Sequence, residues 1–183
     1  MSVTLDKGHK VNLAKADGGQ LTKIFLGLGW DVATDGDTVD LDANCVLLDG
    51  AKKVIDKVFF NHKQSNDGSV QHSGDNLTGE GDGDDETIEV NLARVPASVQ
   101  YLAFTVASYK GHKLSVLNNA YVRVLDDKGV ELAKYNLTAL GNTTGMIMGK
   151  VYRHNGGWKF HAIGEPADGR TVTEQLAAVA AAC

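Results

Sequence analysis

The sequence predicts an all-β protein, a two-sheet β-sandwich followed by one short C-terminal α-helix. Two observations carry this prediction: apolar and polar residues alternate in short segments along most of the chain, and turn-forming residues separate those segments. A period of two places successive side chains on opposite faces of a strand, so each segment can bury one face. About ten such strands at short spacing are typical of a sandwich.

The expected strands follow one another from the N-terminus. They are VTL at 3–5, KIFLGLGW at 23–30, DLDANCVLL at 40–48, KVFFNH at 57–62, ETIEVNL at 86–92, VQYLAFTVASY at 99–109, LSVLNNAYVRVLDDKGVELAKY at 114–135 and GMIMGKVYRHNGGWKFHAIG at 145–164. Within the last two segments, Asp-Lys-Gly at 127–129 and Asn-Gly-Gly at 155–157 predict hairpin turns. In the tail, Thr171 and Glu174 form a capping-box pattern ahead of an alanine run, which predicts the helix.

The length and composition favour a single domain over residues 1–183. The chain has 183 residues, 43% hydrophobic, with no linker-like stretch and no repeat of 20 to 50 residues, which excludes solenoids and propellers. The start, MSVTLDKGHK, has no apolar run, and no stretch approaches the roughly 20 apolar residues of a membrane span. Two cysteines, Cys45 and Cys183, make no disulfide framework. We expect a soluble cytoplasmic protein.

Charge is segregated along the chain, although the net charge is only −5. Residues 24–51 and 64–93 contain no Lys or Arg, yet together they carry fourteen of the 23 acidic residues. A solvated acidic loop is the simplest interpretation. Two carboxylates about 4 Å apart repel by roughly 1 kcal/mol in water and more when buried, so six acids within residues 75–86 would hold that segment open. We therefore expect a cation to close it.

The segment SGDNLTGEGDGDDE at 73–86 has the composition of a calcium site. Side-chain oxygens occur at nearly every other position, with glycines that let carboxylates and backbone carbonyls converge on an ion taking six to eight oxygens. The absence of His and Cys from this segment disfavours zinc or copper. No window fits an EF-hand, and a single turn resembling a calcium-binding nonapeptide repeat cannot stack as a β-helix.

Further oxygens are expected from strands outside this segment. Asp40 and Asp42 lie two apart on one strand, so both carboxylates point away from the apolar face that carries Cys45. Asp31 and Asn61 each follow a strand in the same way, where a simple turn residue is the alternative. The six histidines show no metal-ligand spacing and are expected on the surface or as strand filler.

Enzyme signatures fail on their spacing. Gly145 and Gly149 are separated by three residues where a phosphate-binding loop needs four, and no Gly-x-Ser-x-Gly occurs. Cys45 alternates with core residues and is expected to be a buried structural thiol. A metal-dependent hydrolase with Asp85 or Glu86 as base stays open as a minor alternative, because no nucleophile is visible. Nucleic-acid binding is disfavoured, since the acidic segments would repel phosphate.

Taken together, SGDNLTGEGDGDDE, GLGWD at 27–31, DLDA at 40–43, VFFNH at 58–62 and YRHNGGWKFHAIG at 152–164 resemble the TerD family of tellurite-resistance and stress-response proteins. The resemblance covers the full chain. It implies a β-sandwich that binds calcium, commonly two ions, in the bacterial cytoplasm; related members include cyclic-AMP-binding proteins of amoebae. Some members carry a basic residue where this chain has Leu77, so one charge near the site is missing here.

Carried onto this sequence, the resemblance implies a set of metal-site residues that agrees with the analysis above. They are Asp31, Asp40, Asp42, Asn61, Asp75, Asn76, Glu80, Asp82, Asp84, Asp85 and Glu86. We expect a non-catalytic calcium-binding module that acts through protein partners in a stress-response complex. Tellurite chemistry would call for accessible thiols, which favours an indirect role. The alternative is a calcium-dependent binder of membrane surfaces or other anionic ligands.

Overall fold

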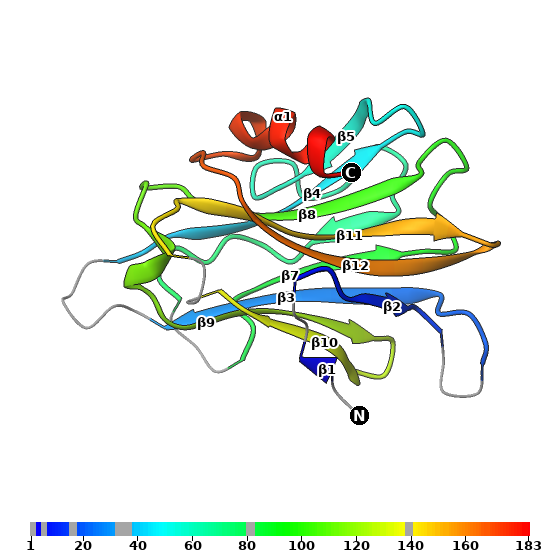
Figure 1. The fold of residues 1–183 in the computed structure, drawn as a ribbon, viewed down its shortest axis with the longest axis horizontal. Helices are drawn as coiled ribbons and strands as arrows, with labels where there is room; N and C mark the ends of the chain where they lie inside the picture. Colours follow the sequence, from blue (N-terminus) through cyan, green and yellow to red (C-terminus); the bar gives the residue numbers. More distant parts are fainter. Residues whose placement is uncertain (1–2, 5–6, 15–17, 32–37, 80–82, 138–140) are drawn as a thin grey trace.

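The computed structural model describes residues 3–4, 7–14, 18–31, 38–79, 83–137 and 141–183. Two six-stranded sheets pack face to face, and one helix covers the outer face of the upper sheet (Figure 1). The first sheet has the order β1-β10-β9-β3-β7-β6, with β1 Val3–Thr4, β3 Lys23–Asp31, β6 Val70–His72, β7 Glu86–Asn91, β9 Asn118–Asp126 and β10 Glu131–Asn136. The second has the order β2-β12-β11-β8-β4-β5, with β2 Lys10–Asn12, β4 Leu41–Leu48, β5 Val54–Val58, β8 Tyr101–Ser108, β11 Gly145–His154 and β12 Gly157–Pro166. The predicted two-sheet sandwich is confirmed, with twelve strands in the described ranges.

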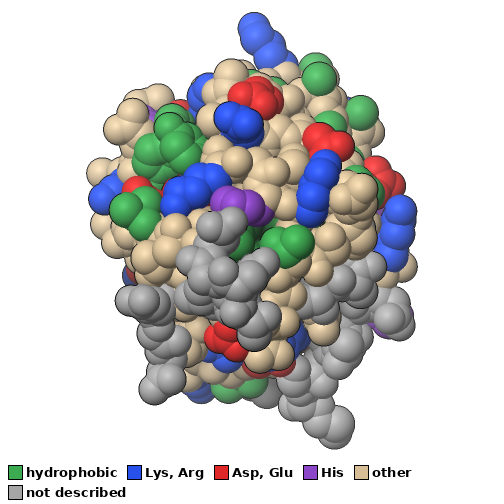
Figure 2. Space-filling model, turned by 90° about the vertical axis from the view of Figure 1, so that its left-hand side faces the viewer, with side chains coloured by type: hydrophobic (Ala, Val, Ile, Leu, Met, Phe, Trp, Pro, Cys, Tyr) green, Lys and Arg blue, Asp and Glu red, His purple; other side chains and the backbone are tan. Residues whose placement is uncertain are grey.

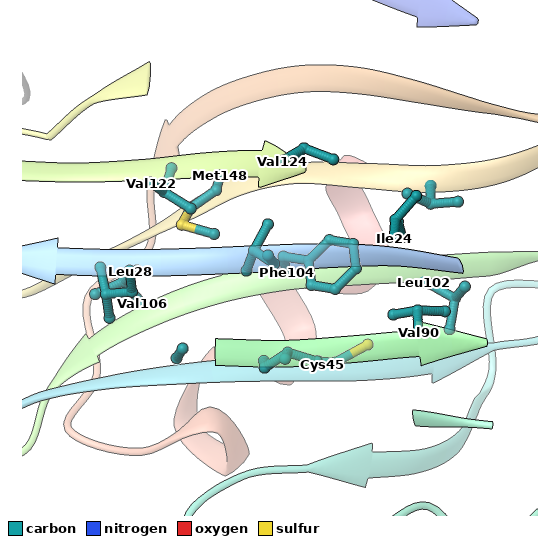
Figure 3. Close-up of a cluster of buried hydrophobic side chains, with 14 of the residues drawn as sticks. Ile24, Leu28, Cys45, Val90, Leu102, Phe104, Val106, Val122, Val124 and Met148 are labelled. Atoms are coloured by element: carbon teal, nitrogen blue, oxygen red, sulfur yellow. The ribbon is translucent and has the colours of Figure 1, made fainter. Parts of the chain in front are cut away.

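The apolar side chains on one face of each strand fill the space between the sheets, as the period-two alternation predicted. In β4, Leu41, Ala43, Cys45 and Leu47 face the sandwich interior, while Val46 and Leu48 belong to a second apolar cluster beneath the helix. Figure 3 shows the interior, where Cys45 and Phe104 lie among aliphatic side chains from both sheets. Both cysteines are buried free thiols, and burial raises the pKa of Cys45. The prediction that Cys45 is buried is confirmed.

Both predicted hairpin turns form. Asn155 and Gly156, at φ of 49° and 78°, join β11 to β12, and this left-handed pair is the geometry that twisted two-residue hairpins need. Between β9 and β10, Asp126 Oδ1 accepts hydrogen bonds from the N–H groups of Lys128 and Val130. A short 3-10 helix, η1 (Leu114–Val116), precedes β9 where the sequence analysis extended the strand.

The C-terminal helix α1 (Val172–Ala182) begins after Thr171 as predicted, but the capping box is incomplete. The Thr171 side chain makes no cap hydrogen bond, and Glu174 accepts from the N–H of Arg170 instead. Gln175 anchors the helix by donating to the carbonyl oxygens of Val106 and Ala167. Among the residues described, no helix has the length and apolarity to cross a membrane.

The strand predicted over 57–62 instead covers Val54–Val58, and this shift shapes the candidate site. β5 ends at Val58, because Phe59 and His62 close a tight turn through reciprocal backbone hydrogen bonds of 3.1 and 2.9 Å. β5 therefore pairs with β4 only from Cys45 to Leu48. Within the described parts of the chain, no strand pairs with the other edge of β4 from Leu41 to Asn44.

Candidate metal centre

Three carboxylates converge beside the open edge of β4. Asp42 lies in β4, Asp40 lies just before it, and Asp75 comes from the segment that follows β6. One oxygen from each lies within 4.8 Å of the others. Asp40 and Asp42 are 5% and 3% exposed, whereas Asp75 faces solvent. We call these residues the carboxylate trio.

Two oxygens of the trio have no hydrogen-bond donor. Asp40 Oδ1 and Asp42 Oδ2 are buried and lack a partner among the described groups. Buried polar atoms are nearly always paired, so an unpartnered carboxylate oxygen at such a position calls for a ligand. Three converging carboxylates, two with a buried free oxygen, fit a hard cation that prefers oxygen ligands.

The electrostatics of the trio point the same way. Burial, together with the charges of Glu86, Asp40 and Asp75, raises the pKa of Asp42 to about 8. Burial and Asp75 also raise the pKa of Asp40, against the opposing charge of Lys110. Without a cation, ionising Asp40 and Asp42 is energetically unfavourable, and a bound cation would favour their ionised forms.

Glu86 joins the two sheets next to the trio. It alternates with Ile88 and Val90 on the interior face of β7 and is fully buried. Its Oε2 accepts a 2.7 Å hydrogen bond from the N–H of Ala43 in β4, and its Oε1 accepts one of 3.2 Å from the N–H of Asn76. Glu86 thus fills the place of the missing β5 partner and ties the 73–79 segment to β4.

His72 completes this connection. Its Nδ1 accepts a hydrogen bond from the N–H of Gly74, so the neutral ring carries its hydrogen on Nε2 and donates to the carbonyl oxygen of Ala43 at 3.1 Å. The same nitrogen lies 3.3 Å from Glu86 Oε2. From the sequence, each histidine is expected on the surface or as strand filler and His72 has no assigned role; the structure shows it buried at the end of β6. The sequence signal for this is the spacing of His72 from Val70: residues two apart in a strand share a face, and Val70 and His72 are both buried while Gln71 is exposed.

Asn76 and Asp85 organise the 73–79 segment. Asn76 Oδ1 accepts from the N–H groups of Thr78 and Gly79, and Asn76 Nδ2 donates to Asp85 Oδ1 at 3.0 Å. The other Asp85 oxygen accepts from the N–H of Trp30. Gly79 has φ of +68°, and a Cβ there would collide with the Trp30 ring, so this turn requires glycine. Burial, opposed by the Trp30 hydrogen bond, raises the pKa of Asp85, with Asp31 contributing.

Two of the remaining predicted ligands, Asp31 and Asp84, accept hydrogen bonds from other side chains. Asp84 lies against Gly27 on the outer face of β3, where it accepts from Arg123 Nε at 2.9 Å and from the Tyr121 hydroxyl at 3.1 Å. Asp31 accepts a 2.7 Å hydrogen bond from Asn119. Asn61 is exposed in the Phe59–His62 turn. Glu80 and Asp82 lie outside the described residues.

Sequence comparison identifies the family of this chain. A profile of the TerD domain matches residues 1–180. The chain belongs to the TerD family. This TerD-family protein is 47% identical over 182 residues to tellurium resistance protein TerZ of Serratia marcescens, covering 94% of each chain. It is also 42% identical over 180 residues to general stress protein 16U of Bacillus subtilis, covering 92% of this chain and 93% of that protein.

A solved structure shares the fold. The crystal structure of a TerD homologue from Streptomyces coelicolor A3(2) matches with a TM-score of 0.75 at 22% identity, covering 84% of this TerD-family chain and 94% of the other. At that identity the match concerns the β-sandwich alone. The family assignment rests on the profile and on the closer relatives.

Proposed function

We propose that this protein is a non-catalytic calcium-binding module of the bacterial stress response, in which the carboxylate trio holds one ion. The observation that carries the proposal is the pair of buried, unpartnered oxygens on Asp40 and Asp42, within 4.8 Å of an oxygen of Asp75. The ion would supply positive charge and bridge β4 to the 73–79 segment. The relatives named as tellurium-resistance and general stress proteins support the stress-response role.

A second ion belongs to the same proposal, beside Asp85. The pKa of Asp85 is raised by burial and by neighbouring acids, as it is for Asp42 in the trio, and Asp31 is one of those acids. Asp31 and Asp85 would supply carboxylate oxygens there, with Glu80 and Asp82 remaining predicted ligands from sequence. Asp84 is assigned a different role, because its ion pair with Arg123 already balances its charge, whereas Asp31 and Asp85 accept hydrogen bonds from uncharged groups.

Glu86 and Asn76 would position the ligands of these ions. Both oxygens of Glu86 accept backbone N–H groups, and the Asn76 oxygen is held by its own turn. These contacts keep Asp75 close to β4. Buried free thiols support a reducing compartment, the cytoplasm, and support an indirect role in tellurium resistance through protein partners rather than thiol chemistry.

Calorimetric titration with calcium tests the proposal. We expect two calcium ions per chain, release by chelator, and loss of one site in Asp42→Asn, with Asp49→Asn in an exposed turn as the matched control. Magnesium should compete poorly, because it demands a tight octahedron near 2.1 Å and gives up water reluctantly. Absence of calcium binding, or an unchanged isotherm in Asp42→Asn, would refute the assignment.

A further inference from the structure

Exposed hydrophobic side chains lie beside two members of the carboxylate trio: Leu77 follows Asp75 in the chain, and Tyr109 lies opposite Asp40. Tyr109 is 48% exposed, its N–H donates to the carbonyl oxygen of Asp40 at 3.1 Å, and its ring meets Phe60 edge-on with centroids 5.8 Å apart. Leu77 is 55% exposed and lies two residues after Asp75. We call Phe60, Leu77 and Tyr109 the apolar rim. Figure 2 shows this end of the molecule, where hydrophobic, basic and acidic side chains lie next to one another.

Two lysines lie close to the same two acids. Lys110 follows Tyr109 and donates to the carbonyl and hydroxyl oxygens of Thr38, two residues before Asp40. Lys63 Nζ lies 3.9 Å from the position that a Cβ on Gly74 would occupy, directly before Asp75. Both side chains reach the solvent. The lysines cannot outweigh the acids at this end while no cation is bound.

The trio itself would leave much of a calcium ion uncovered. Three carboxylates supply only part of a shell of six to eight oxygens. Asp75 opens onto a solvent-filled hollow of about 620 Å³, lined by Asn76, Leu77 and Asp85 among others. Asp75 and Leu77 line the same open hollow, so oxygens of an external anion can reach an ion held by Asp75.

We propose that this end of the protein is a calcium-dependent docking surface for membranes that carry anionic phospholipid headgroups. The inference rests on the proposed calcium site. Headgroup phosphate oxygens would complete the ion's shell, Lys63 and Lys110 would face neighbouring headgroups, and the apolar rim would enter the interface, a depth at which tyrosine is favoured. A free phosphorylated solute would leave Leu77 and Tyr109 exposed, and nucleic acid offers the rim no apolar layer, so a lipid surface fits best.

Vesicle sedimentation tests this proposal with defined lipids. The full chain is mixed with vesicles of phosphatidylcholine alone, or of phosphatidylcholine and phosphatidylglycerol at three to one, with calcium or with chelator. We expect sedimentation only with phosphatidylglycerol and calcium together. Leu77→Ala with Tyr109→Ala should weaken vesicle binding about tenfold and leave the calcium isotherm unchanged. Val130→Ala is the matched control, since Val130 is also 48% exposed but lies in the β9–β10 turn at the opposite end.

The lysines give a test that separates vesicle binding from calcium binding. Lys63→Gln with Lys110→Gln removes positive charge beside the ion, so calcium affinity should hold or rise, while vesicle binding should fall about fivefold or more. A variant merely damaged in folding would lose both.

Three outcomes would overturn the docking surface while sparing the calcium site: calcium binding without vesicle binding, equal binding to both vesicle types, or equal losses in Val130→Ala and the rim variant. Calorimetric binding of glycerol phosphate as tight as vesicle binding would also overturn it, in favour of a soluble ligand. Absence of calcium binding would refute the proposed function itself.

Discussion

The carboxylate of Glu86 accepts a 2.7 Å hydrogen bond from the backbone N–H of Ala43, across the gap between the two sheets. A strand would ordinarily satisfy that N–H, but β5 ends too early to reach it. A buried side chain of one sheet therefore completes the ladder of the other. The candidate metal centre lies next to this contact, in which a side chain takes the place of a strand partner.

Replacing Glu86 should destabilise the fold even without calcium. Glu86→Ala leaves the N–H groups of Ala43 and Asn76 without acceptors, and we expect a loss of about 2–4 kcal/mol in the free energy of unfolding. Urea denaturation in chelator at pH 6 measures this. Glu89→Ala is the matched control on the outer face of β7, where a partly exposed ion pair with Lys23 is worth at most about 1 kcal/mol. Equal losses in the two variants would contradict the assigned role.

The calcium-free protein should lose stability as pH rises toward 8. The pKa of Asp42 is raised to about 8 in the fold, well above the value of about 3.9 for an unfolded chain. The stabilising contribution of its bound proton is full below pH 4 and is lost as pH rises through 8. Thermal melting from pH 5 to 8.5, compared with Asp42→Asn, isolates this contribution.

Calcium should remove that pH dependence, because an ion in the trio favours ionised Asp42. We expect the melting curves of wild type with calcium to change little over the range in which the chelated protein weakens. Identical pH profiles for wild type and Asp42→Asn in chelator would contradict the proton assignment, whatever calcium does.

Calcium binding should stabilise the fold and protect the 73–79 segment. An ion at a hundredfold excess over its Kd adds about 2.7 kcal/mol, which for a domain of this size raises Tm by about 5–10 °C. Hydrogen exchange should slow in residues 73–79 and stay unchanged in β11. Exchange that is equally fast there with and without calcium would mean that Asp75 is only a solvated acid.

Asp84 should behave unlike its acidic neighbours. Asp84→Asn weakens the hydrogen bond to Arg123 at a partly buried site, so we expect a loss of about 1 kcal/mol with two calcium ions still bound. Denaturation and calorimetry on the same sample measure both quantities. Loss of an ion in Asp84→Asn, matching Asp42→Asn, would return Asp84 to the ligand set.

Local pattern was sufficient for the fold class of this protein. Alternation placed Leu41 and Cys45 on an interior face, and the turn at Asn155 and Gly156 set a hairpin, because both depend on neighbours along the chain. Composition alone also singled out residues 73–86 as a candidate cation site, because the number of acidic side chains in a short segment can be read directly from the sequence.

The tertiary structure decided which of those oxygens meet. Asp75 joins Asp40 and Asp42 from more than thirty residues away, and no local period encodes that distance. Asp84 and Glu86 are two similar acids in one short segment. Asp84 pairs with Arg123 of β9 on the outer face of its sheet, whereas Glu86 accepts from Ala43 of β4 in the interior. Periodicity determines the face of a strand on which a side chain lies. The partner it finds there depends on where neighbouring strands end, which is settled only when the sheets pack.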